Sequence, residues 1–199
     1  STISNSDGED PLNYNAFTAN HTDFITVVTD GETGEPIYFP KNSIKRDDLT
    51  VIKASCCLPA VCKPIVIDGK DCFDGGISDP IPFQKAFDMG CDKVIVVISK
   101  PIDYRKSPQK HMPIIKAALK KYPKVFDRLA VRHEVYNRQL EEAIKLQEQD
   151  KVIILAPQDC YGVNTLTREP AALEKLYEEG RRCADEHLSE IKAPGEKTA

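Results

Sequence analysis

The stretch Lys93-Val94-Ile95-Val96-Val97-Ile98-Ser99 decides the fold class of this 199-residue chain. Its five consecutive β-branched residues predict a strand. Because polar and apolar residues do not alternate, we expect both faces of the strand to be buried, as in a sheet covered by helices on each side. Val152–Leu155 is a second run of the same kind.

Strands and helices alternate on both sides of this stretch. An Asp68-Gly69 turn predicts a tight hairpin, and the turn cluster Asp30–Pro36 predicts another. The expected strands cover residues 24–29, 37–39, 65–67, 71–73, 93–99 and 152–155, and the expected helices cover residues 47–56, 82–89, 113–122, 124–149 and 170–191. This order predicts the α/β class, with a partly parallel sheet flanked by helices.

The two longest predicted helices carry apolar residues at helical spacing. On the helix of residues 124–149 this stripe includes His133, which we interpret as a packed core histidine rather than a ligand. The final helix is expected to bury one side, formed by Leu173, Leu176, Tyr177, Ala184, Leu188 and Ile191.

Composition places the chain among ordinary globular proteins, with 41% hydrophobic residues, 29% charged residues and a formal net charge of -4. This excludes collagen-like, disordered and coiled-coil classes. The longest apolar run, Val94–Ile98, is far shorter than the roughly 20 residues that cross a bilayer. The chain starts at Ser1 without an intact signal peptide, so we expect a processed product or a piece of a longer protein.

Charge suggests the domain organisation. Residues 1–44 hold seven acidic residues and one basic residue, whereas residues 100–132 hold ten basic residues and two acidic ones. We expect an acidic leader or connecting segment at residues 1–22, the main domain at 23–192 and a flexible tail at 193–199. The basic stretch suits either an anionic membrane surface or a solvated helix face. No nucleic-acid motif accompanies it, and we expect no nucleic-acid partner.

Seven cysteines form an odd set without the spacing of a small disulfide-rich domain. They predict reduced thiols in a cytoplasmic protein. Cys56 and Cys57 are interpreted as buried, inert thiols. No CxxC or HExxH motif occurs, so we expect no metal and no cofactor.

The most unusual segment, residues 67–82, packs four aspartates and three glycines between strands and a helix start. Gly75 and Gly76 allow backbone paths closed to other residues, and they leave room beside Asp74 for a second main chain or a substrate. A loop carboxylate after a strand suits a general base. The same residues also suit a turn followed by a helix cap.

Motifs for other chemistries are absent from the 199 residues. There is no GxSxG nucleophile elbow. Neither GxGxxG nor GxxxxGK[ST] occurs, so nucleotide binding has no support.

Several pieces, in order, resemble the second half of a patatin-like phospholipase. The first pieces are Val27-Val28-Thr29-Asp30 with Thr33-Gly34-Glu35-Pro36, and the segment Lys53–Pro59, which carries the family's alanine-serine pair (Ala54-Ser55) and proline (Pro59). The next are the block Phe73-Asp74-Gly75-Gly76 with Asp79-Pro80-Ile81-Pro82, and the strand Lys93–Val97. The last is Val131-Arg132-His133 with Tyr136-Asn137. The resemblance covers most of residues 23–188.

The resemblance implies an incomplete patatin-like fold that lacks the N-terminal strands. It also implies a Ser–Asp dyad acting on lipid acyl esters in lipid catabolism. Asp74 takes the role of the catalytic aspartate, and Gly75 and Gly76 shape its loop. The nucleophilic serine and the oxyanion glycines of the family lie upstream of the first matching residue, so this chain alone is not expected to hydrolyse esters.

A second interpretation stays open, namely a non-catalytic interaction module that keeps the patatin-like fold. Under both interpretations we expect a cytoplasmic protein that can be peripheral at membranes. An incomplete sheet leaves an unpaired strand edge, which favours a homo-oligomer.

Overall fold

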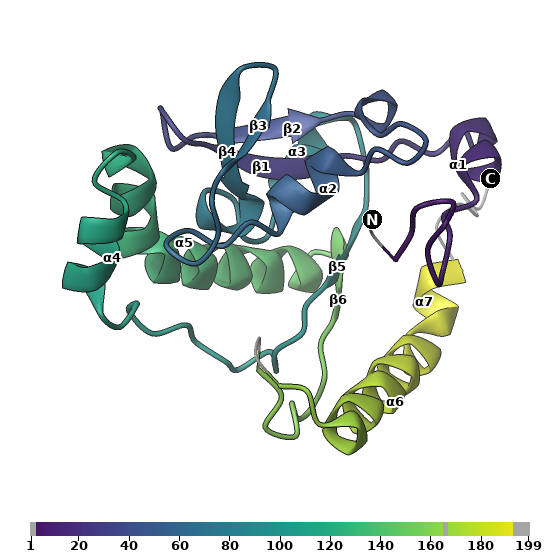
Figure 1. Ribbon diagram of the computed structural model, residues 1–199. Coiled ribbons are helices and arrows are strands. Elements are labelled where there is room, and N and C mark those ends of the chain that lie inside the picture. Colours follow the sequence, from purple (N-terminus) through teal and green to yellow (C-terminus); the bar gives the residue numbers. More distant parts are fainter. Residues whose placement is uncertain (1–2, 165–166, 193–199) are drawn as a thin grey trace. The chain divides into compact units, whose positions relative to one another are not determined.

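The computed structural model describes residues 3–164 and 167–192, so the tail predicted at 193–199 lies outside the described residues. The chain forms two compact units, which are described separately (Figure 1). Unit 1 comprises residues up to Pro80 together with Ser107–Val135. Unit 2 comprises Ile81–Lys106 and the residues from Tyr136 onwards.

Unit 1 is built on a four-stranded antiparallel sheet in the order β2-β1-β4-β3. The strands are β1 (Thr26–Asp30), β2 (Pro36–Phe39), β3 (Ile65–Ile67) and β4 (Lys70–Asp74). Both predicted hairpins are confirmed. At the turn between β3 and β4, Asp68 and Gly69 have φ values of 50° and 79°, the left-handed conformation that an Asp-Gly turn adopts readily.

Most helices of unit 1 are short. They are α1 (Tyr14–Ala19), the 3-10 turns η1 (Lys41–Ser43) and η2 (Gly75–Ile77), α2 (Thr50–Ser55), α4 (Met112–Ala118) and the first part of α5 (Pro123–Glu148). One core cluster joins Phe73 of β4 to Leu119, Val125 and Leu129. A second cluster of Val28, Ala54 and Cys72 lies between the sheet and α2.

Unit 2 contains a two-stranded parallel sheet formed by β5 (Val94–Val97) and β6 (Val152–Leu155). The remaining helices are α3 (Phe83–Asp88), the second part of α5, α6 (Pro170–Glu186) and α7 (Leu188–Lys192). Val96 and Ile154 pack with Phe83 of α3 and Leu140 of α5. The α/β class is therefore confirmed, although the parallel and antiparallel strands lie in different sheets.

Burial of β5 on both faces was predicted, and this prediction is wrong. Val96 is buried, but Ile95 is 44% exposed and Val97 is 74% exposed. The cause is the small size of the sheet: the helical core cluster covers the face that carries Val96, and β5 pairs only with β6 among the described strands. In β6, by contrast, Val152, Ile153 and Ile154 are all buried.

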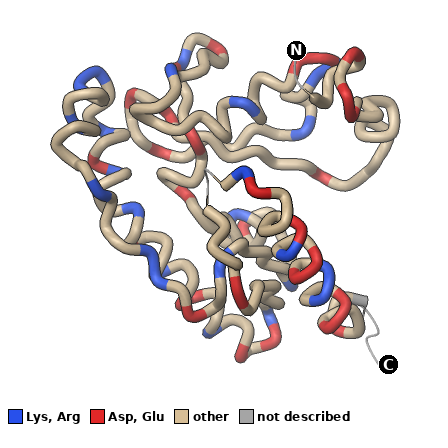
Figure 2. Tube along the Cα trace, turned by 60° about the horizontal axis from the view of Figure 1, so that its bottom comes forward, with Lys and Arg blue, Asp and Glu red and all other residues tan. Residues whose placement is uncertain are grey.

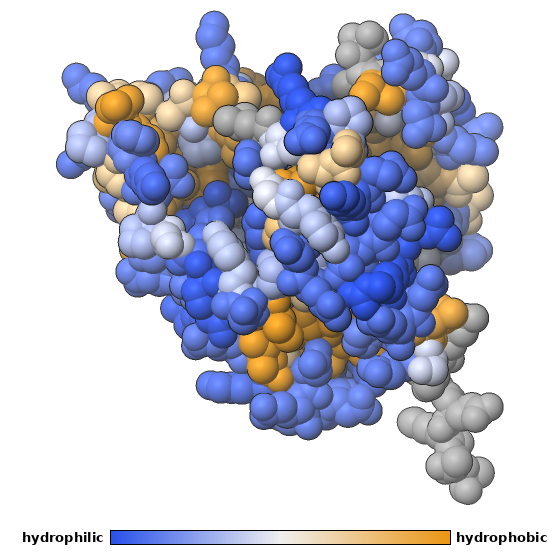
Figure 3. Space-filling view, turned by 90° about the horizontal axis from the view of Figure 1, so that it is seen from below, coloured by the Kyte–Doolittle hydropathy of each residue, from blue (hydrophilic) through white to orange (hydrophobic). Residues whose placement is uncertain are grey.

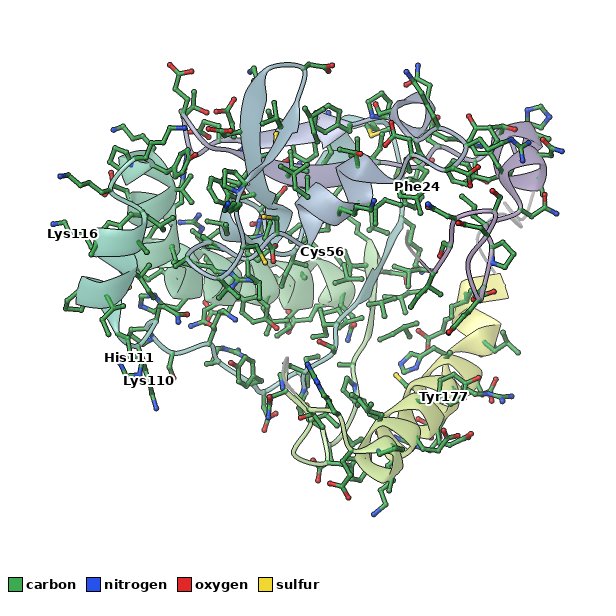
Figure 4. All side chains as sticks on the ribbon, viewed as in Figure 1. Phe24, Cys56, Lys110, His111, Lys116 and Tyr177 are labelled. Atoms are coloured by element: carbon green, nitrogen blue, oxygen red, sulfur yellow. The ribbon has the colours of Figure 1, made fainter. Side chains whose placement is uncertain are left out.

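The predicted apolar side of the last helix is also largely wrong. Leu173, Tyr177 and Leu188 are exposed, and Tyr177 projects from α6 in Figure 4. The residues that α6 buries are Glu179 and Cys183. A polar residue occupies the inner side because both Glu179 carboxylate oxygens are paired, Oε1 with the Gln158 N–H (2.7 Å) and both with the Arg182 guanidinium. The single helix predicted at 170–191 is moreover two helices, since α6 ends at Glu186.

None of the helices in the described ranges is long and apolar enough to span a membrane. Hydrophobic side chains are nevertheless present at the surface, where they stand as separate patches on a largely hydrophilic face (Figure 3).

Candidate active site around Asp74

Asp74 is the last residue of β4, and its backbone is held on two sides. It pairs with Val28 of β1, and its N–H donates to the carbonyl of Cys57 at 2.9 Å. The residue therefore lies where β1, β4 and the segment after α2 meet.

The two oxygens of the Asp74 side chain differ in their environment. Oδ1 accepts a hydrogen bond from the Gly76 N–H at 2.7 Å, so the side chain caps the 3-10 turn η2. No described group donates to Oδ2. Asp74 is half-buried, and its Oδ2 is not among the buried side-chain atoms without a partner in the described part of the chain. One oxygen thus fixes the orientation and the other is open to accept a proton.

Gly75 is needed because a neighbouring backbone comes very close. A Cβ at this position would lie closer than 3.0 Å to the O, C and Cβ atoms of Val27. Neither Gly75 nor Gly76 has a positive φ. The expectation that these glycines follow a backbone path closed to other residues is therefore wrong. The accompanying expectation, that they leave room for a second main chain, is confirmed at Gly75.

Three side chains hold the turn, two of them from distant parts of unit 1. Thr29 Oγ1 of β1 donates to the Asp74 carbonyl at 2.7 Å and lies 2.8 Å from Ser78 Oγ. Arg132 Nε of α5 donates to the Gly76 carbonyl at 2.5 Å. Its Nη2 and Asp74 Oδ1 each lie 3.1 Å from the point that a Gly76 Cβ would occupy. A guanidinium therefore lies near the carboxylate.

These three residues were not predicted as part of the site. Thr29 belongs to a quoted motif without an assigned role, and Ser78 follows the glycines closely. Arg132 is 56 residues away from Gly76 in sequence, and no sequence pattern connects the two.

Cys57 is the titratable neighbour of Asp74. Burial, followed by the influence of Cys62 and of the Asp74 carboxylate, raises the pKa of the Cys57 thiol to about 11. Its Sγ donates to the Lys63 carbonyl at 3.0 Å. The prediction of an inert, buried thiol is confirmed for Cys57, but it is wrong for Cys56, which is exposed at the end of α2 (Figure 4).

This contrast predicts selective alkylation. At pH 8 only about 10⁻³ of Cys57 is thiolate, the reactive form, and burial restricts access further. We expect iodoacetamide to modify Cys56 and to spare Cys57 in the folded chain, as read by mass spectrometry. Cys56→Ser should remove one rapidly modified site and Cys57→Ser none. Rapid modification of Cys57 before unfolding would contradict the arrangement.

Asp30, at the end of β1, is 4% exposed and fully paired. Oδ1 accepts from the N–H groups of Glu32 and Thr33, and Oδ2 lies 3.1 Å from Lys70 Nζ. Burial alone would raise the pKa of Asp30, but these hydrogen bonds and the Lys70 charge outweigh it. The pKa therefore lies below its ordinary value of 3.8.

A lowered pKa in the folded state gives a defined pH dependence. The unfolded chain binds the proton first as the pH falls, so the stabilisation by Asp30 is complete above pH 3.8 and is lost as the pH falls through the folded pKa. We expect Asp30→Asn to lower the free energy of unfolding by about 2 kcal/mol at pH 7. Urea titrations at pH 3 and pH 7 give the change in the free energy of unfolding between the two pH values. We expect this change to be smaller for Asp30→Asn than for the wild type, and equal changes would contradict the assignment.

The basic stretch of residues 100–132 is largely engaged within the chain. Arg105, Lys121 and Arg128 form ion pairs with Glu141, Asp71 and Glu35, and Lys116 lies over the Phe126 ring. Acidic residues gather near the N-terminus, whereas both signs of charge are interspersed elsewhere (Figure 2).

His133 is packed, with 18% of its side chain exposed, as expected for a core histidine. Within residues 3–164 and 167–192, no three His, Cys, Asp or Glu side chains are grouped in a way that could hold a metal ion. All seven cysteines are free thiols.

The fold and this turn define an α/β chain with a candidate acid–base carboxylate on a glycine-containing turn. In a comparison with family models, residues 5–87 match the family described as patatin-like phospholipase. That range includes Asp74, Gly75 and Gly76, and over it the resemblance to the patatin-like family is confirmed. Residues 122–193 match a domain of unknown function (DUF6363).

Proposed function

We propose that this chain supplies the aspartate of a Ser–Asp dyad in a lipid acyl hydrolase, and that the nucleophilic serine lies outside these 199 residues. Asp74 accepts the serine proton when the hydroxyl attacks the ester carbonyl. Gly75 and Gly76 add no side chains of their own beside the carboxylate. The substrates are lipid acyl esters, consumed in lipid catabolism.

The observation that carries the proposal is the unequal environment of the two Asp74 oxygens. A general base must be held in place and must still have a free lone pair for the incoming proton. The Gly76 N–H fixes Oδ1 at 2.7 Å, while Oδ2 has no donor among the described residues. A serine hydroxyl within about 2.6–3.2 Å of Oδ2 would complete the dyad.

The test restores a nucleophile. The chain is joined to an upstream segment that carries a GxSxG motif, and hydrolysis of p-nitrophenyl acyl esters is compared between Asp74 and substituted forms. The 199-residue chain without that segment serves as the inactive reference. Activity that does not depend on Asp74 would exclude the proposed role.

Two observations favour a second function, a non-catalytic interaction module. No GxSxG motif occurs in the chain, and Asp74 is also used as the cap of η2. The mass of the native protein separates the two proposals. A native mass of about 22 kDa favours the module, and a clearly larger mass favours the hydrolase.

Location and membrane contact stay predictions. We propose a cytoplasmic protein that contacts an anionic membrane peripherally through the basic stretch of residues 100–132.

A further inference from the structure

An apolar pocket of about 430 Å³ lies in unit 1 between α1, η1 and the segment that leads into β1. Its volume falls in the range of about 300–1,000 Å³ that is typical of small-molecule sites. Apolar walls come from Leu12, Ala16, Phe17 and Phe24. Leu12 and Phe24 are 38% and 41% exposed, so the pocket opens to solvent.

The walls of this pocket are fixed by specific contacts. The rings of Phe17 and Phe24 meet edge to face at 5.6 Å between centroids. Lys41 Nζ lies 5.1 Å from the centre of the Phe17 ring and donates to the carbonyls of Asn20 and Thr22. The ammonium group has three N–H donors, so one remains for a ligand at the rim.

The pocket and Asp74 are connected through β1. Phe24 (labelled in Figure 4) precedes the first residue of β1 by two positions. In the same strand Val28 pairs with Asp74, and Gly75 packs on the backbone of Val27. The aromatic walls and the carboxylate are therefore both positioned by the first residues of β1 and the segment before it.

We infer that this pocket binds the unbranched acyl chain of a lipid, with the carboxylate or ester oxygen of that chain at Lys41. The inference goes beyond the proposed hydrolase site, since Asp74 does not line this pocket, and it rests on the proposed function for the choice of ligand class. The charged residues that line the pocket are Lys41 and Asp23. Their charges cancel, and Lys41 is the cation available to a ligand oxygen. Binding strength should then come from the chain more than from the head group.

Chain length gives the first test, with the 199-residue chain and isothermal titration calorimetry. We expect the affinity for octanoate, decanoate and dodecanoate, each below its micellar concentration, to rise about fourfold per added methylene. Dodecanoyl lysophosphatidylcholine should bind with an affinity within about tenfold of dodecanoate if the chain dominates. No increase with chain length would overturn the inference.

Variants locate the site. Phe24→Glu should weaken dodecanoate binding at least tenfold, while Leu173→Glu should not change it; Leu173 is an equally exposed apolar residue (43%, against 41% for Phe24) on α6. Ala16→Trp fills the pocket from α1 and should also weaken binding, which keeps the test valid if Phe24→Glu does not fold. Lys41→Met should weaken dodecanoate binding about threefold and affect the lysophospholipid less. Wild-type affinity in folded Phe24→Glu or Ala16→Trp would overturn the assignment.

The two proposals can fail separately. Asp74→Asn should bind dodecanoate as the wild type does, because Asp74 does not line the pocket. Chain-length-dependent binding without Asp74-dependent hydrolysis would support the acyl-chain pocket and exclude the hydrolase proposal. Asp74-dependent hydrolysis without binding at Phe24 would exclude the acyl-chain pocket and leave the hydrolase proposal standing.

Discussion

Asp74→Asn is expected to lower ester hydrolysis by about 10²–10⁴-fold once the nucleophile is restored, the range typical of a lost general base. Asn keeps the shape of the side chain and its Oδ1 can still accept from the Gly76 N–H, so the turn should persist. It cannot accept the serine proton at the position of Oδ2. The measurement is kcat/KM for p-nitrophenyl esters of the joined protein.

The matched control is Asp68→Asn. Asp68 is an exposed aspartate in the β3–β4 turn with a φ of 50°, a conformation that Asn adopts readily. This variant should keep the wild-type rate. A rate for Asp74→Asn within a few-fold of the wild type would show that the carboxylate only caps η2.

Gly75→Ala should have the largest effect on stability, a loss of about 3 kcal/mol or more. The added methyl group would overlap the backbone of Val27, and β1 cannot move without disturbing its pairing with both β2 and β4. The free energy of unfolding from urea titration measures the loss.

Two other glycines supply the comparison. Gly180 lies inside α6, and no atom lies within 4 Å of the point that a Cβ would occupy there, so Gly180→Ala should stabilise by about 0.5–1 kcal/mol. At Gly76 the nearest atoms, at 3.1 Å, belong to the side chains of Arg132 and Asp74, which can shift, and an intermediate loss is expected. Equal effects at Gly75 and Gly180 would refute the close-packing explanation.

Local signals in the sequence were sufficient for most elements. The Asp68-Gly69 turn specifies its own hairpin, and the β-branched runs at Val94 and Val152 mark β5 and β6. These signals do not show which elements pack against each face of a strand or helix. The composition of β5 permits burial on both faces, but Ile95 and Val97 are exposed because burial depends on which elements pack there. In α6, an ion pair allowed Glu179 to replace an apolar residue on the inner side.

In the candidate site, too, local residue types could be predicted from the sequence, whereas tertiary contacts could not. Asp74, Gly75 and Gly76 are adjacent and could be found from their residue types. Room for a second main chain at Gly75 was expected, but the residue types do not show that this main chain is Val27 of another strand. Arg132 reaches the turn from α5, and only the tertiary structure brings these groups together.

The partly uncovered strand β5 has a consequence for handling the protein. On the edge of β5 opposite β6, the N–H and C=O groups have no partner among the described strands, and the side chains of Ile95 and Val97 are exposed. Such an edge can pair with a strand of another molecule. Purified material should accordingly become polydisperse as its concentration rises. A lysine introduced at Val97 should improve its colloidal behaviour and leave the hydrogen bonds between β5 and β6 intact.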